Sequence, residues 1–557
     1  MKIIPAHRPI NERPRRGQAT TLLIAVALIA LPLRLYVALN AEMISRDGAV
    51  FIWYAQGLQR DWVGELRAQK QHPLYPAMVL GAHQILQGTQ SVLRAPAPDP
   101  VRTWIAAAVS VSLIGGLAVV VAAYCLGRVL FDFRVGLIAA LLAAVAAEFC
   151  QLSGDALTDM PHLAVYLLAL AAAARGLRDR QHGWLVLAGL LSGVAYLIRP
   201  EGAEVAVVAA AGGLLIGRAI PLKQRAVAAV LVCLGAGLVA SPYMAVTGKL
   251  VPKKSVKQLF RGQAHGQPLA VPNMDRRLAA NRPGPHLENR DNNLSIPLGA
   301  LTGVTERDAG MLGSVPADLG RAWGRIGENW ARSLRVTLLL PAVWWLVVRR
   351  RRPCEPVGGR LAGGAMILHL VILTALIVHF DYWRLFSLRH VMILAGLTLP
   401  FAAAGIAAVL DAVPAHRQNA AMVALAVGLI GPTLPWMLET RFADEVHIRQ
   451  AGEWIRAHDD NVPRVMTTRF RAALYANGVA VWCPPEPDPE RVLAEARWRR
   501  PTWMVFETET GPARGPDFLD ALYKSTVAGE RLERVRRVAG RGPEARSAVV
   551  FRYHAPP

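Results

Sequence analysis

Long runs of apolar residues, separated by short polar loops, fill the chain from its start to about residue 438. Runs that are long enough to cross a bilayer, or nearly so, occupy 20–39, 102–127, 135–151, 160–175, 184–198, 203–217, 226–246, 334–348, 361–379, 390–410 and 420–438. A helix needs about 20 apolar residues to span the hydrocarbon core. The pattern therefore predicts a polytopic α-helical membrane protein with about eleven transmembrane helices.

Two other segments have a different pattern. The run 74–87 is apolar but short and carries His83 and Gln84, which predicts a helix lying on the membrane surface. After about residue 440, short strand-like runs such as 464–467 and 503–507 alternate with helical patterns, which predicts a small α/β domain outside the membrane.

The predicted organisation has three parts. A basic tail at 1–19 comes first. A transmembrane domain at 20–438 follows, with a first outer loop at 40–101 and a large outer loop at 247–333. The α/β domain occupies 439–557.

Composition agrees with a membrane protein. Of 557 residues, 53% are hydrophobic and only 18% are charged, too few to cover a soluble protein of this size. The net charge of +22 could indicate a nucleic-acid partner, but the basic residues cluster in short loops between apolar runs and no basic strip is interleaved with aromatic residues. We therefore expect no nucleic-acid binding. The five cysteines form no CxxC pair, so neither a disulfide framework nor a zinc site is predicted.

The basic clusters also predict orientation. Loops on the side of the N-terminus hold Arg128 and Arg134; Arg175, Arg178 and Arg180; Arg218, Lys223 and Arg225; and Arg349 to Arg352. Positive loops favour the cytoplasm, so we expect a cytoplasmic N-terminus in an inner membrane and an extracytoplasmic α/β domain. The N-terminal apolar run is too long for a typical signal peptide, which favours an uncleaved first helix.

Two acidic loops fall on the predicted outer side. Asp47 follows the first span, and Asp155 and Asp159 precede the span at 160–175. A carboxylate at a membrane boundary can take a proton from an attacking hydroxyl, as a general base does. The alternative is that Asp47 and Asp159 cap the helices that follow them, aided by Gly48 and Pro161.

Further candidates lie on the same side. His72 and Tyr75, in a rigid proline-flanked turn, could donate to phosphate or sugar oxygens, although an interfacial tyrosine would also fit there. Arg199 could clamp a phosphate and pair with Glu201, or its side chain could merely reach toward the interface. Lys253 and Lys254 could recognise a lipid phosphate or be attracted to anionic headgroups.

These motifs, in this order, resemble the GT-C superfamily of integral-membrane glycosyltransferases, especially the bacterial branch of dolichyl-phosphate-mannose protein mannosyltransferase-like and aminoarabinose-transferase-like enzymes. The resemblance is carried by Arg46-Asp47-Gly48, His72-Pro73-Leu74-Tyr75-Pro76, Leu157-Thr158-Asp159, the stretch from Gly193 to Gly202, Ser387-Leu388-Arg389-His390, and the tail beginning Ala451-Gly452-Glu453-Trp454-Ile455. It covers most of the chain except 258–333.

The resemblance implies an enzyme that moves one sugar from a polyprenyl-phosphate donor to a lipid, glycan or protein acceptor at a membrane surface, in the synthesis of lipopolysaccharide or another envelope glycan. It implies Asp47 as the base, Asp159 as a residue that orients acceptor or donor, and Arg199 and Arg389 near the lipid phosphate. Arg46, Asp155 and His390 lie within or beside the matching motifs, and we expect them to bind substrate.

One departure concerns a metal. Many members have a second acid directly after the first aspartate or two positions on, but this chain has Gly48 and Ala49, which weakens the case for a divalent cation, and no other cofactor is expected. Two other functions remain open from the residues: a transporter or flippase of a lipid-linked sugar, and a scaffold whose outer domain binds an envelope partner. Transporters place charged groups at mid-membrane, whereas these candidates cluster at one surface, which favours the enzyme.

Overall fold

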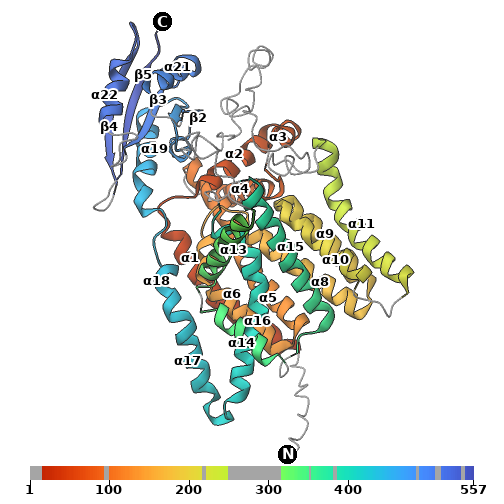
Figure 1. The fold of residues 1–557 in the computed structure, drawn as a ribbon. Helices are drawn as coiled ribbons and strands as arrows, with labels where there is room; N and C mark the ends of the chain where they lie inside the picture. The colour runs from red at the N-terminus through yellow and green to blue at the C-terminus, as the bar shows by residue number, and fades with distance from the viewer. Residues whose placement is uncertain are drawn as a thin grey trace, which may run out of the picture.

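The structure is a computed structural model that describes residues 16–69, 71–92, 99–215, 221–248, 315–335, 337–349, 353–380, 386–484, 488–508, 516–540 and 546–556. A body of helices carries a small α/β domain at one end (Figure 1). This architecture confirms the predicted class, a polytopic helical protein with a C-terminal α/β domain.

The body is built from helices that pack side by side. They are α1 (Arg16–Leu39), α5 (Pro100–Leu130), α6 (Phe133–Val145), α7 (Ala147–Ser153), α8 (Asp159–Asp179), α9 (His182–Ile198), α10 (Ala203–Leu215), α11 (Leu222–Thr247), α14 (Leu339–Val348), α15 (Pro356–Phe380), α16 (Met392–Ala412), α17 (Gln418–Ile430) and α18 (Leu434–Met437). Within the described residues, seven helical segments are individually long and apolar enough to span a membrane, and the bent pair α6–α7 would make an eighth. Every predicted apolar run contains helix, while the number of eleven spans stays a prediction.

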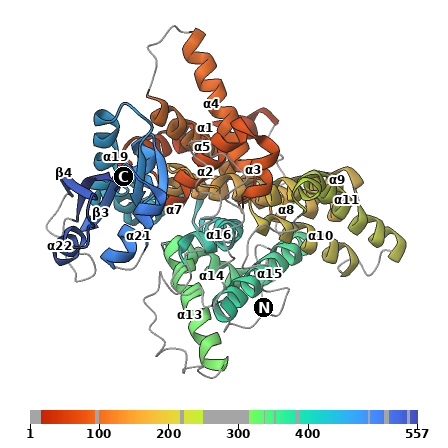
Figure 2. The same ribbon diagram turned by 90° about the horizontal axis from the view of Figure 1, so that it is seen from above.

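Further elements lie outside this list. They are α2 (Arg46–Arg60), α3 (Trp62–Ala68), α4 (Leu74–Val92), α13 (Val315–Ser333), and the 3-10 turns η1 (Pro200–Gly202) and η6 (Leu388–Val391). Of these, α2, α3 and α4 lie at the end of the body nearest the α/β domain (Figure 1). The run predicted as a surface helix is α4, which packs against α5. Seen from above, the α/β domain lies to one side of the body and α9 to α11 to the other, with α16 near the centre (Figure 2).

A buried arginine repairs a break in the body. Helices α6 and α7 are bent by 60° at Ala146, which leaves carbonyl groups at the end of α6 without their usual helical donors. Arg34, fully buried on α1, donates to the carbonyls of Ala143 at 2.9 Å and Ala144 at 2.8 Å. An unsatisfied carbonyl is costly where water is excluded, so Arg34 allows the chain to turn here.

The C-terminal domain is one mixed sheet with helices. Its elements are α19 (Val446–His458), β1 (Arg464–Thr467), α20 (Arg471–Tyr475), β2 (Val479–Trp482), α21 (Pro489–Arg499), β3 (Trp503–Thr508), α22 (Pro516–Lys524), β4 (Arg531–Ala539) and β5 (Ser547–His554), preceded by the turn η9 (Ala443–Glu445). The strand order is β2-β1-β3-β5-β4; β1 is parallel to β2 and β3, and β5 is antiparallel to β3 and β4. The predicted strands at 464–467 and 503–507 are β1 and β3.

This domain shares a hydrophobic core with the outer helices. Ile448 and Trp503 belong to the same buried cluster as Ile44 and Phe51. The Tyr475 hydroxyl also accepts a hydrogen bond from the Ile44 backbone N–H at 3.1 Å. The first outer loop and the tail therefore lie at the same end of the body. The membrane side on which that end lies, and the domain boundaries given above, stay predictions.

We expect Arg34→Met to lower the free energy of unfolding by about 3 kcal/mol, because the Ala143 and Ala144 carbonyls lose a charged donor inside the body. Thermal unfolding of the detergent-solubilised protein measures this as a lower Tm. Arg102→Met is the matched control. The Arg102 side chain is 78% exposed, its ion pair with Asp99 is 3.5 Å long, and its loss should leave Tm nearly unchanged. An unchanged Tm for Arg34→Met would show that the break needs no donor.

Candidate active site

Asp47 lies in the first turn of α2 and does not cap that helix. The cap is Ser45, whose hydroxyl accepts a hydrogen bond from the Gly48 N–H at 3.2 Å. The capping explanation for Asp47 is therefore wrong, and its side chain, 52% exposed, points to a partner outside its own helix. Gly48 has a separate reason to be glycine: a Cβ there would lie 2.8 Å from the Ala156 Cβ, so only glycine lets α2 approach the second acidic loop.

Asp155 joins the two acidic loops. Its carboxylate accepts hydrogen bonds from the backbone N–H of Ser45 at 2.9 Å and of Ala156 at 2.7 Å. The other carboxylate oxygen lies 3.0 Å from the Arg441 guanidinium, which comes from the segment leading into the C-terminal domain. With only 2% of its surface exposed, Asp155 holds the loop that begins α2. Its geometry is that of a positioning residue.

Asp159 is the first residue of α8, and Thr158 occupies the cap position. The prediction that Asp159 could serve as the cap is therefore wrong. Its buried carboxylate is bound by two guanidinium groups. Arg199 Nη1 donates to one oxygen at 2.6 Å, and Arg389 donates to the other from Nε at 3.0 Å and lies 2.9 Å away through Nη2. A buried carboxylate is tolerated when it is paired in this way.

Arg199 ends α9 in an extended conformation that directs it across to α8. It pairs with Glu201 at 3.3 Å as well as with Asp159. Burial lowers the pKa of Arg199, but Glu201 and Asp159 outweigh burial and hold that pKa above its ordinary value. The predicted pairing of Arg199 with Glu201 is present. The Arg199 side chain is directed at Asp159. This geometry differs from the alternative, in which the side chain would merely reach toward the membrane interface.

Arg389 connects the two acidic loops. While its Nε and Nη2 face Asp159, its Nη1 donates to Asp47 at 2.7 Å. We call Asp47, Asp159, Arg199, Glu201 and Arg389 the carboxylate–guanidinium cluster. It gathers three acids and two permanent cations from four separate parts of the chain at one end of the body. The cluster can hold an anion on its guanidinium groups and offer a carboxylate as a base.

Arg46 adds a cation beside the cluster. It is exposed, and its guanidinium lies 5.6 Å from the centre of the Phe470 ring in the C-terminal domain. Arg471 of that domain is bound to Glu445 and donates to the Ile44 carbonyl at 3.4 Å. The surface next to Asp47 is therefore formed jointly by the first outer loop and the C-terminal domain.

Three other predicted residues lie outside the cluster. The Tyr75 hydroxyl is fully buried, donates to the Ala108 carbonyl at 3.1 Å and contacts the Ser112 hydroxyl at 2.9 Å, so it anchors α4 to α5. The buried His72 ring lies 5.0 Å from the Tyr196 ring. The His390 ring completes a capping box with Ser387. Substrate contacts by these side chains stay predictions.

Two predicted residues, Lys253 and Lys254, lie outside the described residues. Within the described part of the chain, no group of three or more His, Cys, Asp or Glu side chains is placed to hold a metal ion. Binding of a divalent cation therefore stays a prediction that the sequence supports only weakly.

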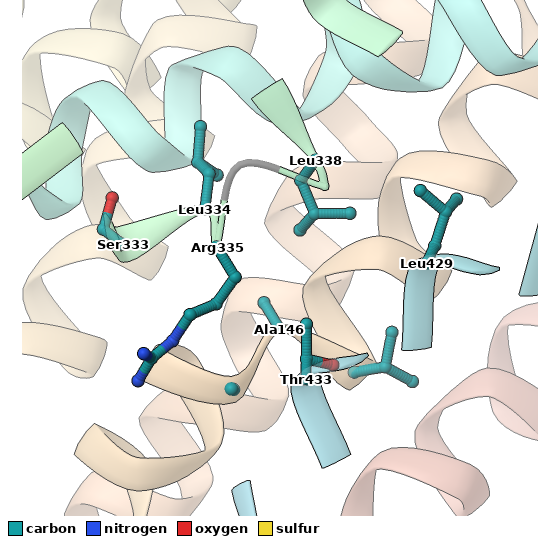
Figure 3. Close-up of a pocket in the computed structure, with 9 residues that line it drawn as sticks. Ala146, Ser333, Leu334, Arg335, Leu338, Leu429 and Thr433 are labelled. Carbon is teal, nitrogen blue, oxygen red and sulfur yellow. The ribbon is translucent and has the colours of Figure 1, made fainter. Parts of the chain in front are cut away.

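Sequence reasoning missed several charged groups inside the body. Glu204 and His369 form a buried pair at 3.0 Å, and His369 also contacts the backbone carbonyl of His390 in the turn that carries Arg389. Arg335 pairs with Glu148 at 2.7 Å and borders a small cavity lined mainly by apolar side chains such as Leu338 and Leu429 (Figure 3). Ionisable residues within apolar runs are the signal that could have found these groups. None of the residues lining the cavity belongs to the carboxylate–guanidinium cluster.

Comparison with known proteins agrees with this architecture. A family model described as dolichyl-phosphate-mannose-protein mannosyltransferase matches residues 103–245, a range that includes Asp159 and Arg199. A search of curated proteins gives no match.

Several solved structures have a similar fold. The oligosaccharyltransferase of Archaeoglobus fulgidus has a TM-score of 0.54 at 14% identity, covering 88% of this chain and 70% of that one. The oligosaccharyltransferase AglB from the same organism, in complex with an inhibitory peptide and a dolichol-phosphate, has a TM-score of 0.52 at 13% identity, with coverages of 88% and 69%. ArnT from Cupriavidus metallidurans, bound to undecaprenyl phosphate, has a TM-score of 0.53 at 13% identity, with coverages of 96% and 98%.

The shared architecture shows the fold of this chain, which is the GT-C fold of these membrane proteins. The match of residues 103–245 to the mannosyltransferase family model agrees with the GT-C resemblance that the order of the motifs indicated.

We expect Asp155→Ala to lower the free energy of unfolding by about 2–3 kcal/mol and to reduce activity in parallel, because Ser45 N–H and Arg441 lose their partner. Asp155→Asn keeps an acceptor for the Ser45 N–H and should retain most of both. Thermal unfolding and activity assays on the two variants make the comparison. If Asp155→Asn abolished activity at an unchanged Tm, Asp155 would be a substrate ligand, as the sequence suggested.

Proposed function

We propose that this protein transfers a monosaccharide from a polyprenyl-phosphate donor to the hydroxyl of a lipid, glycan or protein acceptor at the outer face of the cytoplasmic membrane. The observation that carries the proposal is the bridge from Arg389 to both Asp47 and Asp159. It supports the proposal because it joins an exposed carboxylate to a guanidinium pair at the end of a membrane-spanning body.

Asp47 is the proposed general base. It is the most exposed acid of the cluster and is bound by Arg389 Nη1, whereas Asp159 is bound by both arginines. The acceptor O–H gives its proton to the Asp47 carboxylate while the acceptor oxygen bonds to the anomeric carbon. The bond from that carbon to the phosphate oxygen breaks, and inversion follows if attack comes from the opposite face.

Arg199 and Arg389 are the proposed ligands of the departing phosphate. The leaving group carries its own negative charge, so cations stabilise it better than an acid would. Asp159 keeps both guanidinium groups in place, and Glu201 does so for Arg199. When Arg389 turns its Nη1 toward a phosphate, the Asp47 carboxylate is released for the acceptor.

The acceptor is proposed to approach over Arg46 and Phe470. Arg46 precedes Asp47 in the first outer loop, and its guanidinium lies 5.6 Å from the centre of the Phe470 ring of the C-terminal domain. Similar solved structures hold dolichol-phosphate with an inhibitory peptide, or undecaprenyl phosphate, which supports a lipid-linked donor here.

We expect Asp47→Asn to reduce sugar transfer by about 10²–10⁴-fold while leaving Tm nearly unchanged, because a base is lost from an exposed position. Mass spectrometry of envelope lipids and glycans, from cells with the wild-type or variant protein, measures the missing sugar. Asp61→Asn is the matched control: Asp61 caps α3 in the same outer loop, and asparagine caps as well as aspartate. A full sugar complement with Asp47→Asn would rule out Asp47 as the base.

We expect Arg199→Ala to weaken use of the donor more than use of the acceptor, with a loss of about 10²–10³-fold in transfer rate. Steady-state kinetics in nanodiscs, with donor and acceptor varied in turn, separate the two effects. Arg178→Ala, which removes a partly exposed arginine paired with Asp179, serves as the control. A lower Tm without any change in donor dependence would limit Arg199 to a structural role.

A further inference from the structure

Three buried polar side chains form a hydrogen-bonded series that ends at the turn carrying Arg389. Glu204, in the first turn of α10, accepts a hydrogen bond from the Tyr166 hydroxyl at 3.2 Å. Its carboxylate oxygens lie 3.0 and 3.2 Å from Nδ1 of His369 on α15. The other ring nitrogen of His369, Nε2, lies 3.0 Å from the backbone carbonyl of His390. The side chains of Tyr166, Glu204 and His369 are each at least 96% buried.

The hydrogen-bond chemistry fixes how His369 is used. A carbonyl can only accept, so Nε2 must carry a hydrogen and donate it to His390. Nδ1 faces a carboxylate, so one proton must lie between them, either on the ring or on Glu204. The pair is neutral overall in both cases, which makes its burial tolerable.

The acceptor of this hydrogen bond belongs to the turn that carries Arg389. His390 follows Arg389 in η6, and α16 begins two residues later at Met392. A bond to the His390 carbonyl therefore fixes the peptide group between His390 and Val391, one residue after Arg389. From this turn the Arg389 guanidinium reaches Asp47 at 2.7 Å and Asp159 at 2.9 Å. A displacement of the guanidinium group by about 1 Å can lower the rate of transfer by about 10²-fold.

We propose that His369, oriented by Glu204 and Tyr166, is a positioning residue for transfer: its bond to the His390 carbonyl holds η6 so that Arg389 spans Asp47 and Asp159. This proposal rests on the proposed function for its effect on catalysis. Its structural part, the hold on η6, can be measured without any substrate.

Removing His369 alone would leave the Glu204 carboxylate buried without its partner, and the protein could fail to fold. The test therefore uses a triple variant, Tyr166→Phe with Glu204→Leu and His369→Leu, which replaces all three polar side chains by apolar groups of similar size. Such replacements of buried ion pairs are often neutral or stabilising. The variant loses the donor to the His390 carbonyl and keeps every residue of the carboxylate–guanidinium cluster.

We expect this triple variant to keep the wild-type Tm within a few degrees and to lose about 10–100-fold in kcat, with a smaller change in the KM of the donor, because Arg389 acts on the charge that develops on the phosphate. Glu204→Gln is the conservative variant: its amide can donate to Nδ1 while Nε2 still donates to His390. It should rescue most of the rate that the triple variant loses. His83→Leu is the control, since His83 is a buried histidine stacked on Trp104 at 3.6 Å.

Hydrogen-exchange mass spectrometry of a peptide covering 386–392 gives the second readout. Exchange should be faster in the triple variant than in the wild type, Glu204→Gln or His83→Leu. Wild-type kcat and wild-type exchange in the triple variant would overturn the proposal. So would a loss of rate in Glu204→Gln as large as in the triple variant, or a rate that merely follows a fall in Tm. If the wild type transfers no sugar, the proposed function fails, and the exchange data still decide whether His369 holds η6.

Discussion

The candidate site depends on one guanidinium group, that of Arg389, placed between two carboxylates. Asp47 and Asp159 come from loops more than a hundred residues apart and would repel each other at close range without a cation between them. Asp159 is almost completely buried, which is tolerable only because Arg199 binds its second oxygen. Arg389 thus joins the two acids, and the position of Arg389 follows from the turn η6.

A second set of contacts makes the C-terminal domain part of this arrangement. Asp155 binds the backbone where α2 begins, and Arg441 binds Asp155. The Tyr475 hydroxyl and Arg471 bind the backbone of Ile44. The loop that carries Asp47 is therefore held from below by the membrane body and from above by the sheet domain. A domain that might have been a separate module instead forms one wall of the site.

The sequence predicted those features that depend on local pattern. Long apolar runs predict helices wherever they occur. Because successive spans alternate in direction, the same pattern places Asp47, Asp159, Arg199 and Arg389 at one end of the body. It did not reveal which group occupies each cap, since Ser45 and Asp47 are both good capping residues and only the backbone geometry selects Ser45.

Pairs of side chains that lie far apart in the sequence could not be predicted individually. Glu204 and His369 are 165 residues apart, and Arg34 meets carbonyls 109 and 110 positions away. Such pairs depend on how helices pack, which periodicity does not specify. The proline-flanked turn at Tyr75 suggested a ligand of phosphate or sugar, and it gave no sign that the Tyr75 hydroxyl joins α4 to α5.

The unequal binding of the two acids suggests an order of events for the proposed reaction. Asp159 is bound by two arginines inside the protein, whereas Asp47 is about half exposed and bound to Arg389 through one nitrogen. A phosphate that competes for the guanidinium groups meets least resistance at Asp47, because an exposed pair contributes little. Donor binding would then release the Asp47 carboxylate, so that the base becomes available only when the leaving group is already held. One arginine would in this way couple recognition of the lipid phosphate to activation of the acceptor.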